Sequence, residues 1–253
     1  MLAATVIPAQ AQRRVVNYLP KYDQEPYHFG FLLAFNEMMY TIKTVEDYQN
    51  MQLDPSSWPD GGSSNVGYYS VYNIETRQRP GFTVGIIGSK RLGRYFDLRF
   101  IPSLSFCDRQ LTYNIVATDL GGNQTVKDPL KKYIFTTFVE FPLNIKYRSK
   151  RYNNIGAYLM GGINPKLDLS SNKQSFDENT GTIKNFVTKR FDTAAEIGVG
   201  FDFYNQWFKM GLEVKMSYGL LDVVKTDTKT SLIYTAPIDQ LRNKMFQISM
   251  LFE

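Results

Sequence analysis

Residues 208–218 read Phe208-Lys-Met-Gly-Leu-Glu-Val-Lys-Met-Ser-Tyr218, an unbroken alternation of apolar and polar side chains. Successive side chains of a β-strand point to opposite faces of a sheet, so this stretch predicts a strand with one apolar and one polar face. The polar face carries Lys209, Glu213 and Lys215 beside glycine and serine. The fold must therefore keep charges on one side of a sheet and large apolar side chains on the other.

The same alternation recurs along the chain and predicts an all-β protein with eight strands. The other strands are expected at about 28–42, 82–86, 96–107, 139–147, 155–167, 196–203 and 246–252. Short turns near 88–94, 149–154 and 205–206 alternate with long polar loops at 44–80, 108–131, 168–190 and 221–243. Short turns at one end and long loops at the other are typical of an eight-stranded antiparallel up-and-down transmembrane β-barrel, with the turns periplasmic and the loops extracellular.

Alternation alone also fits a soluble barrel with an apolar interior. Eight strands, however, enclose a lumen barely wide enough for side chains, and stacked Phe, Met and Leu would overfill it. The polar face fits that space, so the apolar face is expected to meet lipid. The polar residues expected to form a charge network in the lumen are Asp97, Arg99, Glu140, Lys146, Glu196, Asp202, Lys209, Glu213 and Lys215.

Four of these charges are expected to pair. A two-residue turn at Asn205-Gln206 sets Asp202 opposite Lys209 and Glu196 opposite Lys215. Opposite charges are what a lumen of low dielectric constant requires, because an unpaired buried charge is costly. The alternative is that these residues are solvated loop charges.

Aromatic residues gather where the predicted strands meet the short turns, and this favours an interfacial girdle over ordinary core packing. The residues of this expected girdle are Tyr95, Tyr147, Tyr152, Tyr204 and Trp207. Two residues fit the strand pattern poorly. Pro142 lies within a strand and predicts a local bulge, and Glu37 lies on the apolar side of the first strand, which must bulge or have left the membrane there.

The start of the chain predicts export. Ala9-Gln10-Ala11 is a small-x-small cleavage site, so residues 1–11 are interpreted as the remnant of a signal peptide, the alternative being a flexible terminus. Residues 12–27 are expected to form an extended periplasmic segment, and residues 28–253 the barrel. An even number of strands places both termini on the periplasmic side of the outer membrane.

Other classes of protein find little support. The chain has one cysteine, one histidine and a formal net charge of only +5. No sequence pattern of a nucleotide-binding loop or zinc site is present, and the longest apolar run, about 29–35, is too short for a membrane-spanning helix. We therefore expect no enzymatic activity, no catalytic residues, no cofactor, no metal, no small-molecule substrate and no nucleic-acid partner.

Several short motifs resemble the PorT family of Bacteroidetes. They are Tyr27-His28-Phe29-Gly30-Phe31, Val139-Glu140-Phe141-Pro142-Leu143, Tyr158-Leu159-Met160-Gly161-Gly162 and Glu213-Val214-Lys215 followed by Ser217-Tyr218-Gly219-Leu220. The resemblance implies a subunit or assembly factor of the type IX secretion system, which exports proteins across the outer membrane and supports motility in gliding species. Its implied partners are other secretion components. The alternative is a stand-alone barrel, structural or surface-binding, that contacts lipopolysaccharide or a host molecule.

Overall fold

The computed structural model describes residues 16–57, 65–170, 188–224 and 232–253, and strands dominate it. The strands are β1 (Tyr27–Thr44), β2 (Val66–Arg91), β3 (Phe96–Phe100), β4 (Ser103–Asp119), β5 (Gln124–Val126), β6 (Leu130–Glu140), β7 (Leu143–Arg148), β8 (Ile155–Asp168), β9 (Phe191–Tyr204), β10 (Lys209–Gly219) and β11 (Ile238–Phe252). The helices are η1 (Tyr22–Gln24), η2 (Tyr48–Asn50), η3 (Pro55–Ser57) and α1 (Leu232–Thr235). Within these described ranges, no helix has the length and apolar character needed to span a membrane.

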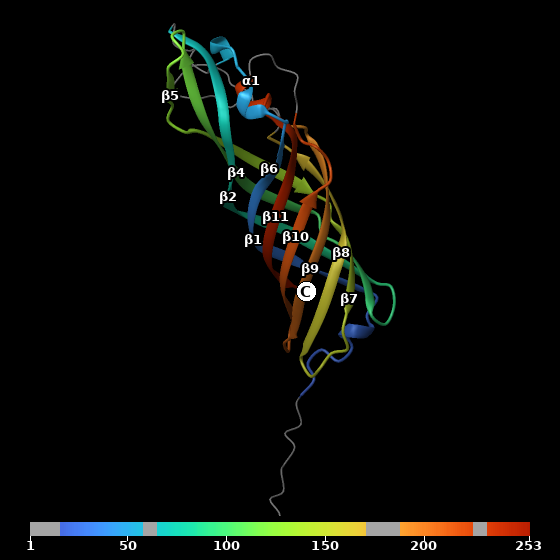
Figure 1. Cartoon of the computed structure of the whole chain (residues 1–253). Helices are drawn as coiled ribbons and strands as arrows, with labels where there is room; N and C mark the ends of the chain where they lie inside the picture. Colours follow the sequence, from blue (N-terminus) through green and yellow to red (C-terminus); the bar gives the residue numbers. More distant parts are fainter. Residues whose placement is uncertain (1–15, 58–64, 171–187, 225–231) are drawn as a thin grey trace, which may run out of the picture.

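The strands form a closed ring in which every pairing is antiparallel (Figure 1). β1 pairs with β2 on one side and with β11 on the other, and the pairing of β8 with β9 completes the circle. β3 and β4 together make one ring strand, and so do β6 and β7, since each pair lies between the same neighbours. The ring therefore has eight strands, and the prediction of an eight-stranded up-and-down barrel is confirmed.

Each of the two composite strands is interrupted next to a proline. Pro102 separates β3 from β4, and Pro142 separates β6 from β7. Proline has no N–H to give to a ladder. The carbonyls still take part, because Pro142 accepts from the Ile101 N–H at 3.2 Å and Pro102 accepts from the Ile86 N–H at 3.0 Å. The bulge predicted at Pro142 is thus a break between two strands. β1, by contrast, runs through Glu37 without a register shift.

The two faces of the ring are inverted relative to a soluble barrel. Outward side chains are large, apolar and exposed, as with Phe29 at 74%, Ile86 at 66% and Ile248 at 53%. Inward side chains are polar and buried, as with Asn36 and Ser105, both at 0%. Exposed apolar side chains on so many strands match the outer wall of a barrel that spans a membrane. We call this wall the apolar belt.

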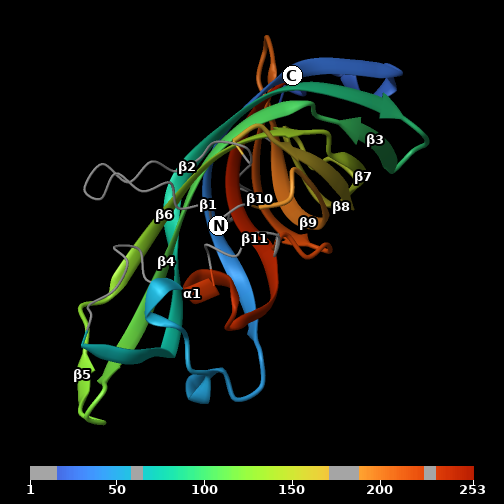
Figure 2. The ribbon, with the colours of Figure 1, turned by 90° about the horizontal axis from the view of Figure 1, so that it is seen from above.

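The two ends of the ring differ. The turn end holds the connections 92–95, 149–154 and 205–208 together with residues 16–26, and the loop end holds the long connections. At the loop end β2, β4 and β6 reach beyond the other strands (Figures 1 and 2). Pairing of β2 with β1 stops at Arg79, whereas its pairing with β4 continues to Val66. We call residues 66–79, 108–119 and 130–135, with β5, the projecting sheet.

The projecting sheet corrects the predicted loops 44–80 and 108–131, much of which is strand. Its inner face is apolar, with Tyr69, Val71 and Tyr113 nearly inaccessible to solvent. These side chains pack against Tyr234 of α1 and Leu241 of β11, and the Tyr113 hydroxyl donates to the Tyr234 carbonyl at 3.0 Å. Burial of this cluster stabilises strand in a region whose overall polarity suggested loop.

The segment before β1 was predicted to be extended, but it folds across the turn end. It contains the helix η1, and the Tyr18 N–H donates to Asn154 Oδ1 at 2.9 Å. The proposed signal-peptide remnant, residues 1–11, lies outside the described residues.

Candidate functional site: a charged lumen

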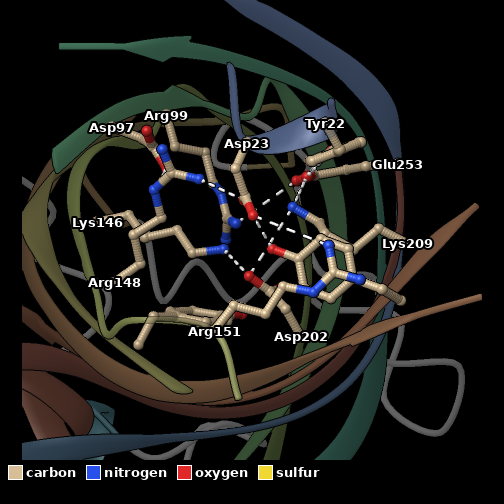
Figure 3. A network of polar contacts seen from close by, with 12 residues as sticks. Tyr22, Asp23, Asp97, Arg99, Lys146, Arg148, Arg151, Asp202, Lys209 and Glu253 are labelled. Atoms are coloured by element: carbon tan, nitrogen blue, oxygen red, sulfur yellow. Dashed lines mark hydrogen bonds and ion pairs between the residues drawn. The ribbon is translucent and has the colours of Figure 1, made fainter. Parts of the chain in front are cut away.

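The lumen next to the turn end is filled by a cluster of buried charges (Figure 3). Arg99 Nη1 lies 2.9 Å from Glu213 Oε2, and Lys146 Nζ lies 2.6 Å from Asp202 Oδ2. Glu253 follows β11 directly and contacts both Lys209 and Arg99, the latter at 3.5 Å. The alternation of β3, β7, β9 and β10 explains the arrangement, because it turns every second side chain of these strands inward.

A second cluster occupies the middle of the lumen and centres on Glu196. Lys215 Nζ lies 3.2 Å from Glu196 Oε2, and the amide of Asn164 donates to Glu196 Oε1 at 2.7 Å. The same amide donates to Glu140 Oε2 at 3.1 Å, and Lys166 Nζ lies 3.3 Å from Glu140 Oε1. A shared amide thus links two ion pairs into one network.

The third cluster lies toward the loop end and has Arg109 at its centre. The Arg109 guanidinium donates to Asn243 Oδ1 and Thr136 Oγ1, and it lies 4.4 Å from the centre of the Tyr40 ring. Asn243 in turn donates to Asp192 at 2.7 Å. Above this cluster the lumen is closed by the apolar residues that pack under the projecting sheet.

All nine residues predicted for the lumen are at least nine-tenths buried. Each also has an opposite charge within 4.0 Å. Asp97 pairs with Arg148, at 3.2 Å, and Glu140 pairs with Lys166. Buried charges need such partners, because an unpaired charge in an interior of low dielectric constant is costly.

The predicted register between β9 and β10 is wrong by two residues. Tyr204 pairs with Lys209, and the Asn205 N–H donates to the Phe208 carbonyl at 3.0 Å, so the tight turn is Gln206-Trp207 rather than Asn205-Gln206. Asp202 therefore lies opposite Gly211, and Glu196 opposite Ser217. A shift of two residues keeps every side chain on its face. Lys215 consequently reaches Glu196 diagonally, while Lys209 stays 3.9 Å from Asp202.

The predicted aromatic girdle is wrong at Tyr204. Tyr95, Tyr147, Tyr152 and Trp207 are exposed, but Tyr204 is 5% exposed and lies inside the barrel. Tyr204 follows Asp202 by two positions in β9, so both side chains point to the same, inward face. There the Tyr204 hydroxyl donates to Asp23 Oδ1 at 3.1 Å, and the Arg151 guanidinium stacks on its ring at 3.8 Å.

Residues 18–24 close the lumen at the turn end. Arg148 Nη1 lies 2.9 Å from Asp23 Oδ1, the Tyr22 ring stacks on His28 at 3.9 Å between centroids, and the Tyr22 hydroxyl donates to Glu253 at 2.8 Å. Burial, and next the Glu253 carboxylate, raise the pKa of the Tyr22 phenol above its ordinary value. Tyr22 therefore remains a neutral hydrogen-bond donor.

Several members of the network were not predicted. Strand parity alone could have indicated Asn164 and Lys166, which alternate with outward residues of β8. Alternation could also have indicated Glu253, which continues the inward parity of Gln247 and Ser249. No sequence signal marks Tyr22 or Asp23, because they lie outside the alternating segments and meet the strands only in the folded ring.

The family comparison agrees with this architecture. Residues 9–225 match a family described as outer membrane protein beta-barrel domain. Among solved structures, the chain is similar to Ail, the attachment invasion locus protein of Yersinia pestis, determined in complex with the heparin analogue sucrose octasulfate. Identity is 8%, the alignment covers 90% of this chain and 98% of that one, and the TM-score is 0.38. No curated protein matches the sequence. The family match spans most of the chain, and the protein is therefore a member of the outer-membrane β-barrel domain family.

Proposed function

We propose that the protein is a non-enzymatic, non-conducting surface barrel whose projecting sheet contacts lipopolysaccharide. The supporting observation is a patch of cationic and aromatic side chains on the outward face of that sheet, next to the apolar belt. Its cationic and aromatic members are Arg77, Arg79, Lys131, Tyr133 and Phe135, and the carboxylates of Glu75 and Asp108 lie on the same face. We call it the outer basic patch.

Strand pairing assembles this patch from three strands. Arg77 pairs with Gln110, and Gln110 pairs with Tyr133, so one row crosses β2, β4 and β6. The Arg79 guanidinium lies 5.3 Å from the centre of the Tyr133 ring. The neighbouring Ile134 packs against the apolar cluster of the inner face, which leaves Tyr133 and Phe135 facing outward.

The chemistry of the outer basic patch matches that of a phosphorylated glycolipid. Basic side chains attract lipid phosphates at the membrane surface, and aromatic rings favour the interface between acyl chains and headgroups. The patch meets such headgroups if the loop end is extracellular and both termini are periplasmic. Long loops outside and short turns inside are the usual arrangement of such barrels.

The experiment compares the wild type with Arg77→Ala/Arg79→Ala. The purified protein in phospholipid nanodiscs is titrated with lipopolysaccharide while its thermal midpoint is followed. We expect lipopolysaccharide to raise the thermal midpoint of the wild type. It should raise the midpoint of the variant by no more than half as much. The control, Lys21→Ala/Lys90→Ala, removes two cations at the turn end and is expected to respond like the wild type. Equal responses of all three proteins would contradict a role for the patch.

The second candidate is an accessory role in type IX secretion, which the sequence resemblance implies. The observation in its favour is the filled lumen, which fits a component that acts through its wall and ends rather than as a conduit. Cross-linking in native membranes followed by mass spectrometry of co-purified proteins tests this role. Recovery of a large translocon favours it, and recovery of the barrel alone favours the surface barrel.

A further inference from the structure

The turn end is hollowed into a pocket of about 450 Å³. Its walls come from residues 17–24, the β2–β3 turn and the β7–β8 turn. The charged residues that line it are Asp23, Arg91, Arg94, Arg148, Lys150, Arg151 and Asp202. We call it the basic mouth pocket. It shares Asp23, Arg148 and Asp202 with the lumen network, but that network leaves Arg91, Arg94 and Lys150 without a role.

Positive charge is in excess in this pocket, because both lining carboxylates already have partners. Asp202 Oδ2 is held by Lys146 at 2.6 Å, and Asp23 Oδ1 by Arg148 at 2.9 Å. Arg91, Arg94 and Lys150 have no carboxylate within 4.0 Å in the described part of the chain. Three cations at one opening repel one another, and an anion between them relieves that repulsion.

Three arginines of the wall are held in place by groups of the protein. Arg148 is held between Asp23 and Asp97, with Nε 3.2 Å from Asp97 Oδ2. Arg151 donates to the carbonyls of Tyr18 and Leu19 and stacks on Tyr204. Arg91 donates its Nε to the Gly93 carbonyl at 2.9 Å, which orients its two terminal nitrogens. Arg148 and Arg151 thus shape the wall, while Arg91 keeps two oriented nitrogens for a ligand, and a preorganised guanidinium binds an oxyanion at a lower entropic cost than a freely moving one.

We propose that the basic mouth pocket binds a phosphate-bearing ligand. Guanidinium groups match the geometry of phosphate oxygens in a bidentate manner, and Lys150 adds a point charge. The volume suits a small organic phosphate, since ligand pockets commonly span roughly 300–1,000 Å³. The phosphate belongs either to a soluble molecule or to a phospholipid headgroup of the adjoining leaflet. This site is separate from the outer basic patch and does not rest on the proposed function.

The test titrates the full-length protein in non-ionic detergent with inorganic pyrophosphate, followed by isothermal calorimetry at low salt. We expect one saturable site whose affinity falls as salt is raised. Arg94→Gln/Lys150→Gln should weaken the affinity at least about tenfold, because hydrogen bonds to charged groups contribute on that order. The control Arg77→Gln/Lys131→Gln removes equal charge at the loop end and should bind like the wild type. Absence of saturable binding, or equal weakening in both variants, would overturn the proposal.

A second arm identifies the source of the phosphate. The same titration is carried out in nanodiscs of phosphatidylcholine with and without phosphatidylglycerol. If pyrophosphate binds the wild type more weakly in discs with phosphatidylglycerol, and the variant Arg94→Gln/Lys150→Gln shows no such weakening, the headgroup is the competing ligand. Unchanged binding identifies a soluble phosphate compound. Both results support a phosphate site in this pocket, and neither depends on lipopolysaccharide.

Discussion

Arg99 Nη1 and Glu213 Oε2 lie 2.9 Å apart, although 114 positions of sequence separate the two residues. Both side chains are 1% exposed, and the Tyr158 hydroxyl donates to the same carboxylate oxygen at 2.8 Å. One pair thus ties β3 to β10 across the lumen, with β8 contributing the third group. This ion pair therefore opposes any change in the cross-section of the barrel.

Removing one partner of this pair should therefore be costly. We expect Arg99→Met to lower the free energy of unfolding by roughly 3–5 kcal/mol, because Glu213 stays buried with an uncompensated charge. The double variant Arg99→Met/Glu213→Leu should recover part of that loss. Urea-induced unfolding in detergent, followed by tryptophan fluorescence, measures both. The exposed pair Lys43–Asp239, at 2.7 Å, is the control, and Lys43→Ala should cost less than about 1 kcal/mol.

Glu196 and Lys215 should be energetically coupled even though they are not directly cross-strand. Their atoms lie 3.2 Å apart along the diagonal of the β9–β10 ladder. In a double-mutant cycle with Glu196→Gln and Lys215→Met, the coupling should exceed about 0.5 kcal/mol. Additive effects on unfolding would mean that Asn164 and Asn144 alone satisfy the Glu196 carboxylate.

Alkaline pH should loosen the closure at the turn end through Tyr22. Its pKa is raised in the folded protein by burial and by Glu253, so the folded state resists loss of the phenol proton. Stability from this group is present below the unfolded pKa of about 10 and is lost as pH rises above it. Between about pH 10 and about pH 11, the free energy of unfolding should fall more steeply in the wild type than in Tyr22→Phe. The exposed Tyr152→Phe should retain the steep wild-type decline.

The barrel should not conduct ions. Eight strands leave a lumen that side chains fill, and here it is closed by buried ion pairs in the middle and by residues 18–24 at one end. Planar bilayers containing the purified protein should show no steady channel current. A steady current abolished by Glu196→Gln/Lys215→Met would place a water-filled path through the middle cluster and contradict the expectation.

The remaining members of the girdle should lie at the level of the headgroups. Trp207, at the Gln206-Trp207 turn, is 86% exposed. In a Trp58→Phe background, lipids brominated near the glycerol backbone should quench Trp207 fluorescence more than lipids brominated near the chain ends. The reverse order would place this turn deep in the bilayer.

The sequence predicted the ring and its two faces because a period of two is a local property of each strand. Lys209, Glu213 and Lys215 were therefore assigned to the lumen even though the register was off by two residues. The position of the turn between β9 and β10 was harder to predict, since Asn205-Gln206 and Gln206-Trp207 differ little in their local preference for a turn. Nearness to a turn places Tyr204 in the girdle, whereas its parity, shared with Asp202, points it into the barrel.

The length of β2 could not be predicted from local pattern. Residues 66–79 are rich in polar side chains on one face, and they form strand by pairing with β4 and by packing Tyr69 and Val71 against Tyr234 and Leu241. The closure by Tyr22 and Glu253 was equally hidden, because it joins residues from the two ends of the described chain. Such contacts depend on which strands the ring brings together.

The position of Glu253 has a consequence for assembly. β11 is the strand that meets β1 to complete the ring, and Glu253 follows it directly. Lys209 meets Glu253 within the β10–β11 pair, since the two backbones bond to each other in both directions. Arg99 of β3 reaches the Glu253 carboxylate only when the ring closes. Sealing the seam and bringing the Glu253 carboxylate to Arg99 are thus one event. Partly sealed rings should accordingly be disfavoured in lipid, because they separate an ion pair that the closed lumen holds together.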